Sequence, residues 1–231
     1  MGRERFLIFF YSEVNSTMLK AREIAREVEA PFVVRAARQT KGYGRKGAFW
    51  VSPEGGLWFT AVFPVKRLPG LSCFLSLVIL KALKGEAPDL RIKWPNDIVY
   101  GKRKVAGLLI EVKGKVFWGV GINLNNELPP ELKGKAVSLK ELTRKDYDPE
   151  PILLSLLDRL FSMLSTFEEQ GLSPFIPEYE KELVFLGKKI EVIYKENLIT
   201  GIAHGISDEG FLKLQTPSGQ LLLPDGTIVK F

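Results

Sequence analysis

Two lysines near the middle of the chain have neighbours that a core strand rarely needs. Lys93 opens the run Lys93-Trp94-Pro95-Asn96-Asp97, which places a cation, an aromatic ring, a proline and two polar groups together. Lys104 opens the apolar run Lys104-Val105-Ala106-Gly107, whose small Ala106-Gly107 pair permits close backbone approach. We therefore expect both lysines to serve one binding or catalytic site.

A third candidate is the glycine-rich run Gly42-Tyr43-Gly44-Arg45-Lys46-Gly47. It fits the G-x-G-x-x-G pattern, but a Rossmann loop opens a helix and precedes an acidic residue by about 20 positions, and neither feature follows here. A P-loop is excluded because Ala48 and Phe49 follow Gly47 in place of Lys and Ser or Thr. The run favours a flexible loop whose cations and N–H groups wrap a phosphate. A surface hairpin with a solvated basic tip is the alternative.

The amino-acid composition excludes several kinds of catalytic and metal site. The chain has one histidine, His204, and one cysteine, Cys73, so it can form neither a Cys-His zinc cluster nor an intrachain disulfide. His204 fits a polar strand end better than a catalytic triad. The net charge of +6 comes from dispersed basic residues and indicates either a solvated surface or an anionic partner. No run approaches the roughly 20 apolar residues of a membrane span, and we expect a cytoplasmic protein.

Periodicity and turn residues predict a large domain at 1–186 and a small one at 187–231. Asn15-Ser16-Thr17 offers capping side chains for a helix that continues to Val28. After Gly187 the chain changes to short alternating runs separated by turns, which is typical of a small β-barrel. The other elements expected are strands at 7–11, 32–34, 56–62, 91–100, 104–112, 115–124, 190–194, 198–203, 211–215 and 220–223, and helices at 71–83 and 149–170.

The three runs described above resemble, in order and spacing, the core motifs of biotin protein ligases. Val14-Asn15-Ser16-Thr17 and the stretch 119–125 are similar to two further motifs of this family, so the resemblance covers essentially the whole chain. It implies an α+β fold: a mixed sheet with helices, related to class II aminoacyl-tRNA synthetases, followed by an SH3-like barrel. Because the catalytic domain begins almost at Met1, the resemblance is to the stand-alone form without the N-terminal DNA-binding domain, and we expect no DNA binding.

The resemblance implies an activity and its partners. A biotin protein ligase uses ATP and Mg²⁺ to activate biotin as biotinyl-5′-AMP and transfers the biotin to a lysine of a biotin carboxyl carrier protein, a part of acetyl-CoA carboxylase or a related carboxylase. The family is often dimeric, and the sequence leaves a homodimer open. The alternatives are a lipoate or octanoate ligase of the same fold and a nucleic-acid-binding module.

The resemblance also assigns roles by position. The catalytic cations are Lys93, Arg45 and Lys104, and Asp97 is the candidate Mg²⁺ ligand. The biotin contacts are Ser16, Thr17, Met18, Gln39, Gly42, Tyr43, Gly44, Arg45, Trp50, Lys104 and Gly107. The ATP and adenylate contacts are Arg45, Lys46, Trp50, Lys93, Asn96, Asp97, Lys104 and Asn123.

Three positions depart from the family pattern. Met18 replaces an Asn, Tyr43 replaces the first Arg of the loop, and Ala48 stands where a further Arg is frequent. The loop therefore carries fewer cations with which to grip the adenylate. We expect the loop from Gln39 to Trp50 to be disordered without ligand and to order over biotinyl-AMP.

Overall fold

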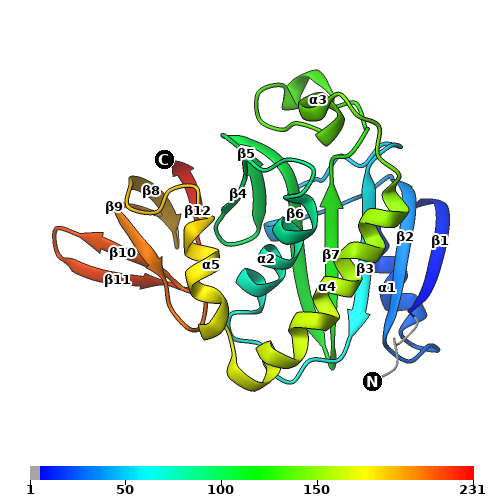
Figure 1. Cartoon of the computed structure of the whole chain (residues 1–231), viewed down its shortest axis with the longest axis horizontal. Helices are drawn as coiled ribbons and strands as arrows, with labels where there is room; N and C mark the ends of the chain where they lie inside the picture. The colour runs from blue at the N-terminus through cyan, green and yellow to red at the C-terminus, as the bar shows by residue number, and fades with distance from the viewer. Residues whose placement is uncertain (1–5) are drawn as a thin grey trace. The chain divides into compact units, whose positions relative to one another are not determined.

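The computed structural model describes residues 6–231 as a mixed α+β fold. Seven strands form a mixed sheet in the order β1-β2-β3-β7-β6-β5-β4, and five form an antiparallel sheet in the order β11-β10-β9-β8-β12. Figure 1 labels the elements along the chain. The strands are β1 (Leu7–Val14), β2 (Phe32–Gln39), β3 (Leu57–Phe63), β4 (Leu90–Lys93), β5 (Asp97–Tyr100), β6 (Arg103–Lys113), β7 (Lys115–Ile122), β8 (Lys189–Tyr194), β9 (Asn197–Ile206), β10 (Leu212–Thr216), β11 (Gly219–Leu223) and β12 (Thr227–Lys230).

The helices are fewer than the strands and differ widely in length. They are α1 (Thr17–Ile24), α2 (Leu71–Leu83), α3 (Leu139–Thr143), α4 (Pro149–Gln170) and α5 (Ile176–Lys181), with single 3₁₀ turns η1 (Arg45–Gly47), η2 (Pro130–Leu132) and η3 (Ser173–Phe175). The chain divides into two compact units, 1–66 with 102–154 and 67–101 with 155–231. We describe each unit by itself.

The first unit is built on strands β1, β2, β3, β7 and β6. β1 and β2 are parallel, with Leu7 opposite Phe32, and the remaining neighbours are antiparallel. β3 is buried along its whole length, so it reads as a continuous apolar run and not as an alternating one. β6 and β7 form a hairpin around Gly114, whose φ of +67° suits glycine in a tight turn.

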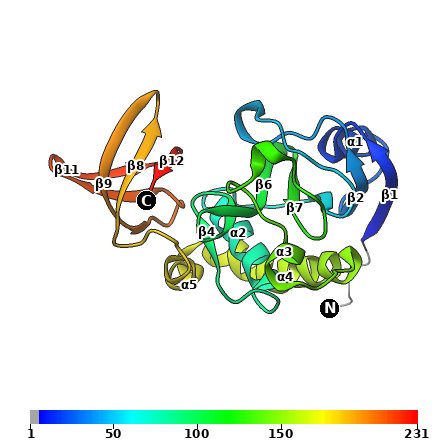
Figure 2. The same ribbon diagram turned by 90° about the horizontal axis from the view of Figure 1, so that it is seen from above.

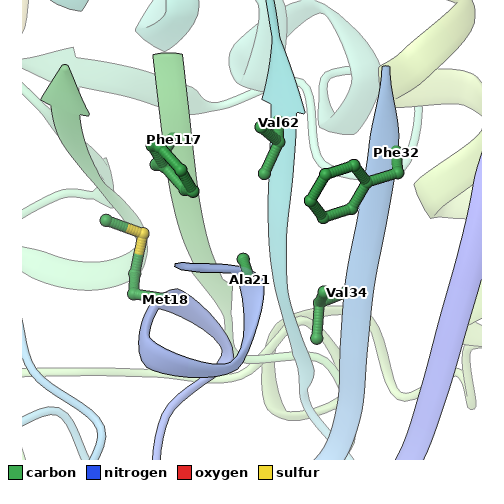
Figure 3. Close-up of a cluster of buried hydrophobic side chains, with 6 residues drawn as sticks. All are labelled: Met18, Ala21, Phe32, Val34, Val62 and Phe117. Carbon is green, nitrogen blue, oxygen red and sulfur yellow. The ribbon is translucent and has the colours of Figure 1, made fainter. Parts of the chain in front are cut away.

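Helix α1 closes one face of this sheet with a small apolar cluster. Met18 and Ala21, one helical turn apart, point from α1 toward side chains on three neighbouring strands (Figure 3). The strand residues of the cluster are Phe32, Val34, Val62 and Phe117. The cluster fixes α1, and with it the residues just before the helix, against the sheet.

The second unit has α2 at its centre, and ten of the helix's thirteen residues are buried. Phe74 of α2 stacks on Phe167 of α4, with ring centroids 4.4 Å apart and an interplanar angle of 17°. The antiparallel hairpin of β4 and β5 also contacts α2. The five-stranded antiparallel sheet, β8 to β12, completes the unit (Figure 2).

The structure confirms the two longest predicted helices, at 71–83 and 149–170, and corrects other expectations. The single strand expected at 91–100 is wrong: β4 ends at Lys93 and β5 begins at Asp97. Pro95 has no N–H with which to continue a strand ladder, and the chain reverses there. β12 was not predicted, and α1 ends at Ile24, short of Val28. The small-domain sheet is confirmed, while its closure into a barrel and the boundary at 186/187 stay predictions.

A search of the helices within residues 6–231 finds no segment with both the length and the apolar character needed to span a membrane.

The Phe74–Phe167 stack should dominate the stability of the second unit. We predict that Phe74→Ala lowers the free energy of unfolding by about 3–5 kcal/mol, because it empties a fully buried aromatic site. Urea denaturation measures the loss. Leu68→Ala, at a side chain that is 45% exposed, is the control and should change stability by no more than about 0.5 kcal/mol. Equal effects of the two substitutions would contradict this view of the core.

Candidate active site

The amide of Gln39 connects the start of α1 to the sheet. Its Oε1 accepts hydrogen bonds from Thr17 N at 2.8 Å and from Thr17 Oγ1 at 3.1 Å, and its Nε2 donates to Ser52 Oγ at 2.9 Å. Thr60 Oγ1 donates to Thr17 Oγ1 at 2.9 Å and extends the network onto β3. Because the network is largely buried and each of these groups has a partner, it holds Thr17 and Gln39 rigidly.

This network corrects the expected helix cap. Ser16 occupies the position before α1, but its side chain makes no capping hydrogen bond. The N–H of Thr17, which has no partner inside the helix, is satisfied by Gln39 from 22 residues away. Ser16 and Thr17 are both buried beside the sheet, and their contact with biotin stays a prediction.

Three glycines on β6 and β7 leave part of the sheet surface without side chains. We call Gly107, Gly119 and Gly121 the glycine floor. Gly107 lies opposite Gly121 in the β6–β7 register, and Gly119 is two residues away on the same face. A Cβ atom on Gly121 would lie 2.5 Å from two atoms of the Trp50 indole, and one on Gly107 would lie 3.1 Å from the same ring. The indole therefore lies directly on the backbone of the sheet.

Two further side chains lie on the glycine floor. Met18 Sδ would be 2.9 Å from a Cβ on Gly119, so Met18 covers that end. Lys104 Nζ lies 4.7 Å from the centroid of the Trp50 ring, close enough for a cation–π contact. Within residues 6–231 the buried Nε1 of Trp50 has no hydrogen-bond acceptor. The Trp50 ring on this floor is thus a flat apolar surface with a cation beside it, and its N–H is buried against Gly121.

The glycine-rich loop forms a compact hairpin at the edge of this floor. Gly44 N donates to Ala48 O at 2.8 Å, and Trp50 N donates to Gly42 O at 2.9 Å. A side chain on Gly42 would collide with Trp50 O and Ser52 Oγ, so only glycine fits there. The tip is the turn η1, in which Lys46 has a φ of 56°. Arg45 is half-buried there and Lys46 is exposed.

Asn123 supports the strand that carries Lys104. Its Nδ2 donates to Lys104 O at 3.4 Å, and its Oδ1 accepts from Asn126 Nδ2 at 3.1 Å. Its backbone N–H donates to Val105 O at 2.9 Å. Asn123 is therefore close to Lys104 but uses its amide within the protein, and its predicted contact with phosphate or ribose stays a prediction.

The Lys93 motif forms the turn of the β4–β5 hairpin in the second unit, with Lys93 opposite Asp97. Ser76 Oγ and Ser72 Oγ of α2 donate to Pro95 O at 2.9 and 3.3 Å. Trp94 is buried and donates from Nε1 to Gly210 O at 2.9 Å. The hairpin is thus held from one side by a helix and from the other by the turn between β9 and β10.

The ammonium of Lys93 lies over the ring of Phe231, with Nζ 5.6 Å from the centroid. Phe231 in turn packs on the buried Phe185, with ring centroids 5.9 Å apart. A lysine on a flexible four-carbon stem is restricted by such a contact. The small domain therefore contributes directly to the position of Lys93.

Cys73 and Tyr179 lie deep in the second unit and stay protonated at neutral pH. Burial raises the pKa of the Cys73 thiol to about 12. Burial likewise raises the pKa of Tyr179 well above its usual range, and the neighbouring Cys73 and Asp97 add to the shift. The thiolate is the nucleophilic form of cysteine, so Cys73 is unsuited to covalent catalysis.

Asp97 is the expected Mg²⁺ ligand, and its surroundings suit a substrate-bound metal. No group of three or more His, Cys, Asp or Glu side chains gathers as a metal cage anywhere in 6–231. Mg²⁺ is usually held by one or two carboxylates together with substrate phosphates and water. A single carboxylate at the β4–β5 turn, near Lys93, fits that arrangement.

The structure brings the predicted residues together in two groups. The loop, Ser16, Thr17, Met18, Gln39, Trp50, Lys104, Gly107 and Asn123 belong to the first unit, and Lys93, Asn96 and Asp97 belong to the second. Whether Lys93 and Lys104 share one site stays a prediction. The sequence did not single out Ser52, Thr60, Glu111 or Phe231, whose partners are distant in the chain. Gly121 was quoted within a motif but given no role.

Family models match both parts of the chain. The model of the biotin/lipoate A/B protein ligase family matches residues 10–124, and that of the biotin protein ligase C terminal domain matches residues 185–230. The fold and the order of the motifs thus define the class of biotin/lipoate protein ligases.

Individual biotin protein ligases are similar to this chain over most of their length. A biotin protein ligase from Aquifex aeolicus, solved in complex with biotin and ATP, is 32% identical with a TM-score of 0.90, covering 97% of this chain and 99% of that one. Biotin--[acetyl-CoA-carboxylase] ligase of Paracoccus denitrificans is 29% identical over 92% of this chain and 96% of its own length. Bifunctional ligase/repressor BirA of Bacillus subtilis is 29% identical, and the match covers 92% of this chain and 70% of BirA. The chain belongs to the biotin protein ligase family.

The glycine floor can be tested by adding one methyl group. We predict that Gly121→Ala displaces the indole of Trp50, because the new Cβ would occupy the same space as the ring. The indole N–H resonance of Trp50 in ¹⁵N-labelled protein should shift, and stability should fall by about 1–3 kcal/mol. Gly85→Ala adds the same methyl group in open space and is the control. A Trp50 resonance that stays in place would show that the ring does not lie on the floor.

Proposed function

We propose that this chain activates biotin with ATP as biotinyl-5′-AMP and transfers the biotinyl group to a lysine of a biotin carboxyl carrier protein. The observation that carries the proposal is the glycine floor covered by Trp50, with Lys104 at its edge and the Gln39 network beside it. The flat apolar surface of this indole, flanked by fixed polar groups, suits a fused-ring substrate with a urea edge and a carboxylate tail. The match to an Aquifex aeolicus structure that holds biotin and ATP supports this substrate pair.

The first step joins two anions. A carboxylate oxygen of biotin attacks the α-phosphorus of ATP, the bond to the bridging oxygen of the β-phosphate breaks, and pyrophosphate leaves. Negative charge accumulates in the transition state, and a lysine placed between carboxylate and phosphate offsets the repulsion. We assign this role to Lys93, whose ammonium is restricted by the Phe231 ring. Mg²⁺ bound to the phosphates, with Asp97 as a protein ligand, would neutralise charge on the leaving group.

The second step consumes the mixed anhydride. The amine of a carrier lysine attacks the biotinyl carbonyl, and AMP leaves with the electrons of the cleaved C–O bond. The anhydride reacts with water as well as with amines, so it must stay covered until the carrier arrives. Arg45, Lys46 and the N–H groups of the loop are suited to hold the phosphate during this interval.

The proposed location of the reaction is the cytoplasm. The only cysteine of the sequence, Cys73, is a buried free thiol, which fits a reducing compartment. The carrier is the proposed macromolecular partner, because the Paracoccus denitrificans relative is a biotin--[acetyl-CoA-carboxylase] ligase.

Pyrophosphate release separates the proposal from a lipoate ligase of the same class. With ATP and Mg²⁺, we expect biotin to stimulate pyrophosphate release at least a hundredfold more strongly than lipoate at equal concentration. The flat surface of the Trp50 indole on the glycine floor suits the fused rings of biotin better than the long alkyl chain of lipoate. Stimulation by lipoate and none by biotin would contradict the assignment.

Replacing Lys93 and replacing Lys104 should impair different steps. We predict that Lys93→Ala reduces adenylate formation at least a thousandfold and leaves biotin affinity within about tenfold, because its charge is needed mainly where carboxylate and phosphate meet. Lys104→Ala should also weaken biotin binding, because this cation lies over the indole of Trp50. Pyrophosphate release and calorimetric titration measure the two effects.

Lys113→Ala, at an exposed lysine on the same strand as Lys104, is the matched control and should leave both measurements unchanged. Near-normal pyrophosphate release by Lys93→Ala would contradict the role given to Lys93. Unchanged biotin affinity in Lys104→Ala would contradict the role given to Lys104.

A further inference from the structure

Tyr43 stands within the glycine-rich loop but is anchored outside it. Its hydroxyl donates to Glu111 Oε1 on β6 at 3.2 Å, across 68 residues of sequence. Its half-buried ring packs against the apolar cluster beneath α1, the cluster drawn in Figure 3. Neither contact resembles that of a residue at a solvated loop tip. Tyr43 therefore ties the base of the loop to the body of the first unit.

Glu111 is held in place from the opposite side. Its Oε2 forms an ion pair with Arg22 of α1 while Oε1 faces Tyr43. The side chains of Arg22 and Glu111 are 28% and 22% exposed, so water and salt screen the pair less than they screen a surface pair. One carboxylate thus joins α1, β6 and the loop. We call Arg22, Glu111 and Tyr43 the latch.

The latch acts on the residue that covers the glycine floor. Tyr43 pairs with Phe49 in an isolated bridge, and the neighbouring Gly42 accepts the backbone hydrogen bond of Trp50. When Tyr43 fixes the base of the loop, it therefore also fixes the backbone of Trp50, from which the indole extends. The tip, with Arg45 and Lys46, extends beyond these bonds and can move while the base stays closed.

We propose that Tyr43 is a positioning residue that determines how long biotinyl-AMP stays bound. Its hydroxyl, held by Glu111 and Arg22, keeps the base of the loop closed, and the loop in turn keeps Trp50 and the phosphate-facing cations over the adenylate. In this sequence a neutral anchor at position 43 thus compensates for a loop with few cations. The ordering that accompanies ligand binding is then confined to the tip, residues 45–47. The inference rests on the proposed function.

The test compares Tyr43→Phe and Glu111→Ala, singly and together, with the wild type. Tyr43→Phe keeps the ring in its apolar site and removes only the hydroxyl. Tyr11→Phe is the matched control, because Tyr11 packs against the same cluster and lies outside the loop. Two quantities are measured: hydrogen exchange of the Gly44 and Trp50 amides in ligand-free protein, and the dissociation rate of preformed biotinyl-AMP.

We expect Tyr43→Phe to raise both rates about three- to tenfold, the range for loss of one partly solvated hydrogen bond to a carboxylate. The rate of pyrophosphate release in a single turnover should fall by a smaller factor than adenylate release rises, because Lys93 is untouched. The double variant should be no faster than the larger single effect, since both substitutions break the same hydrogen bond. Tyr11→Phe should match the wild type.

Unchanged amide exchange and adenylate release in Tyr43→Phe would overturn the inference, as would single effects that multiply in the double variant. A fall in pyrophosphate release as large as the rise in adenylate release would also overturn it, because a merely structural defect slows adenylate formation as much as it speeds adenylate loss. If the wild type forms no biotinyl-AMP, the proposed function fails. Amide exchange, which needs no substrate, then still decides whether the latch holds the loop base.

Discussion

The indole of Trp50 can lie on the β6–β7 backbone only because Gly107 and Gly121, opposite each other in the ladder, have no side chains. A methyl group at either position would enter the space of the ring. Most of the proposed site follows from this contact. Lys104 lies against the indole, and the loop ends at Trp50. Gly42 must also be glycine because Trp50 O lies against it. The position of the indole is thus determined by the sheet.

The main feature of the second unit is the set of contacts that restricts the flexible side chain of Lys93. Strand β4 is only four residues long, and a short hairpin gains little stability from its own ladder. The contacts that hold it come from elsewhere: two serines of α2 on Pro95 O, the turn at Gly210 on Trp94, and the Phe231 ring under Lys93. Residues at the turn and the end of the small C-terminal sheet thus contribute to the position of Lys93.

The sequence predicted what depends on local pattern and missed what depends on distant partners. The helices at 71–83 and 149–170 follow from long, uninterrupted apolar periodicity, and their bounds were confirmed. The strand at 91–100 was wrong because its apolar residues continue on both sides of Pro95 while the backbone does not. The cap from Gln39 to Thr17 and the bond from Tyr43 to Glu111 span 22 and 68 residues, and no local signal marks them. The small Ala106-Gly107 pair was the sign of a close backbone approach that the sequence offered, while Gly119 and Gly121 were quoted only as part of a motif.

In the proposed function this single chain both activates biotin and transfers it to a carrier lysine. Intact-mass spectrometry of a biotin carboxyl carrier domain, incubated with the protein, biotin, ATP and Mg²⁺, measures it directly. The account predicts a gain of one biotinyl group, lost when ATP is omitted and absent from a carrier whose acceptor lysine is replaced by arginine. A carrier mass that does not change with wild-type protein would contradict the account, as would labelling spread over several lysines.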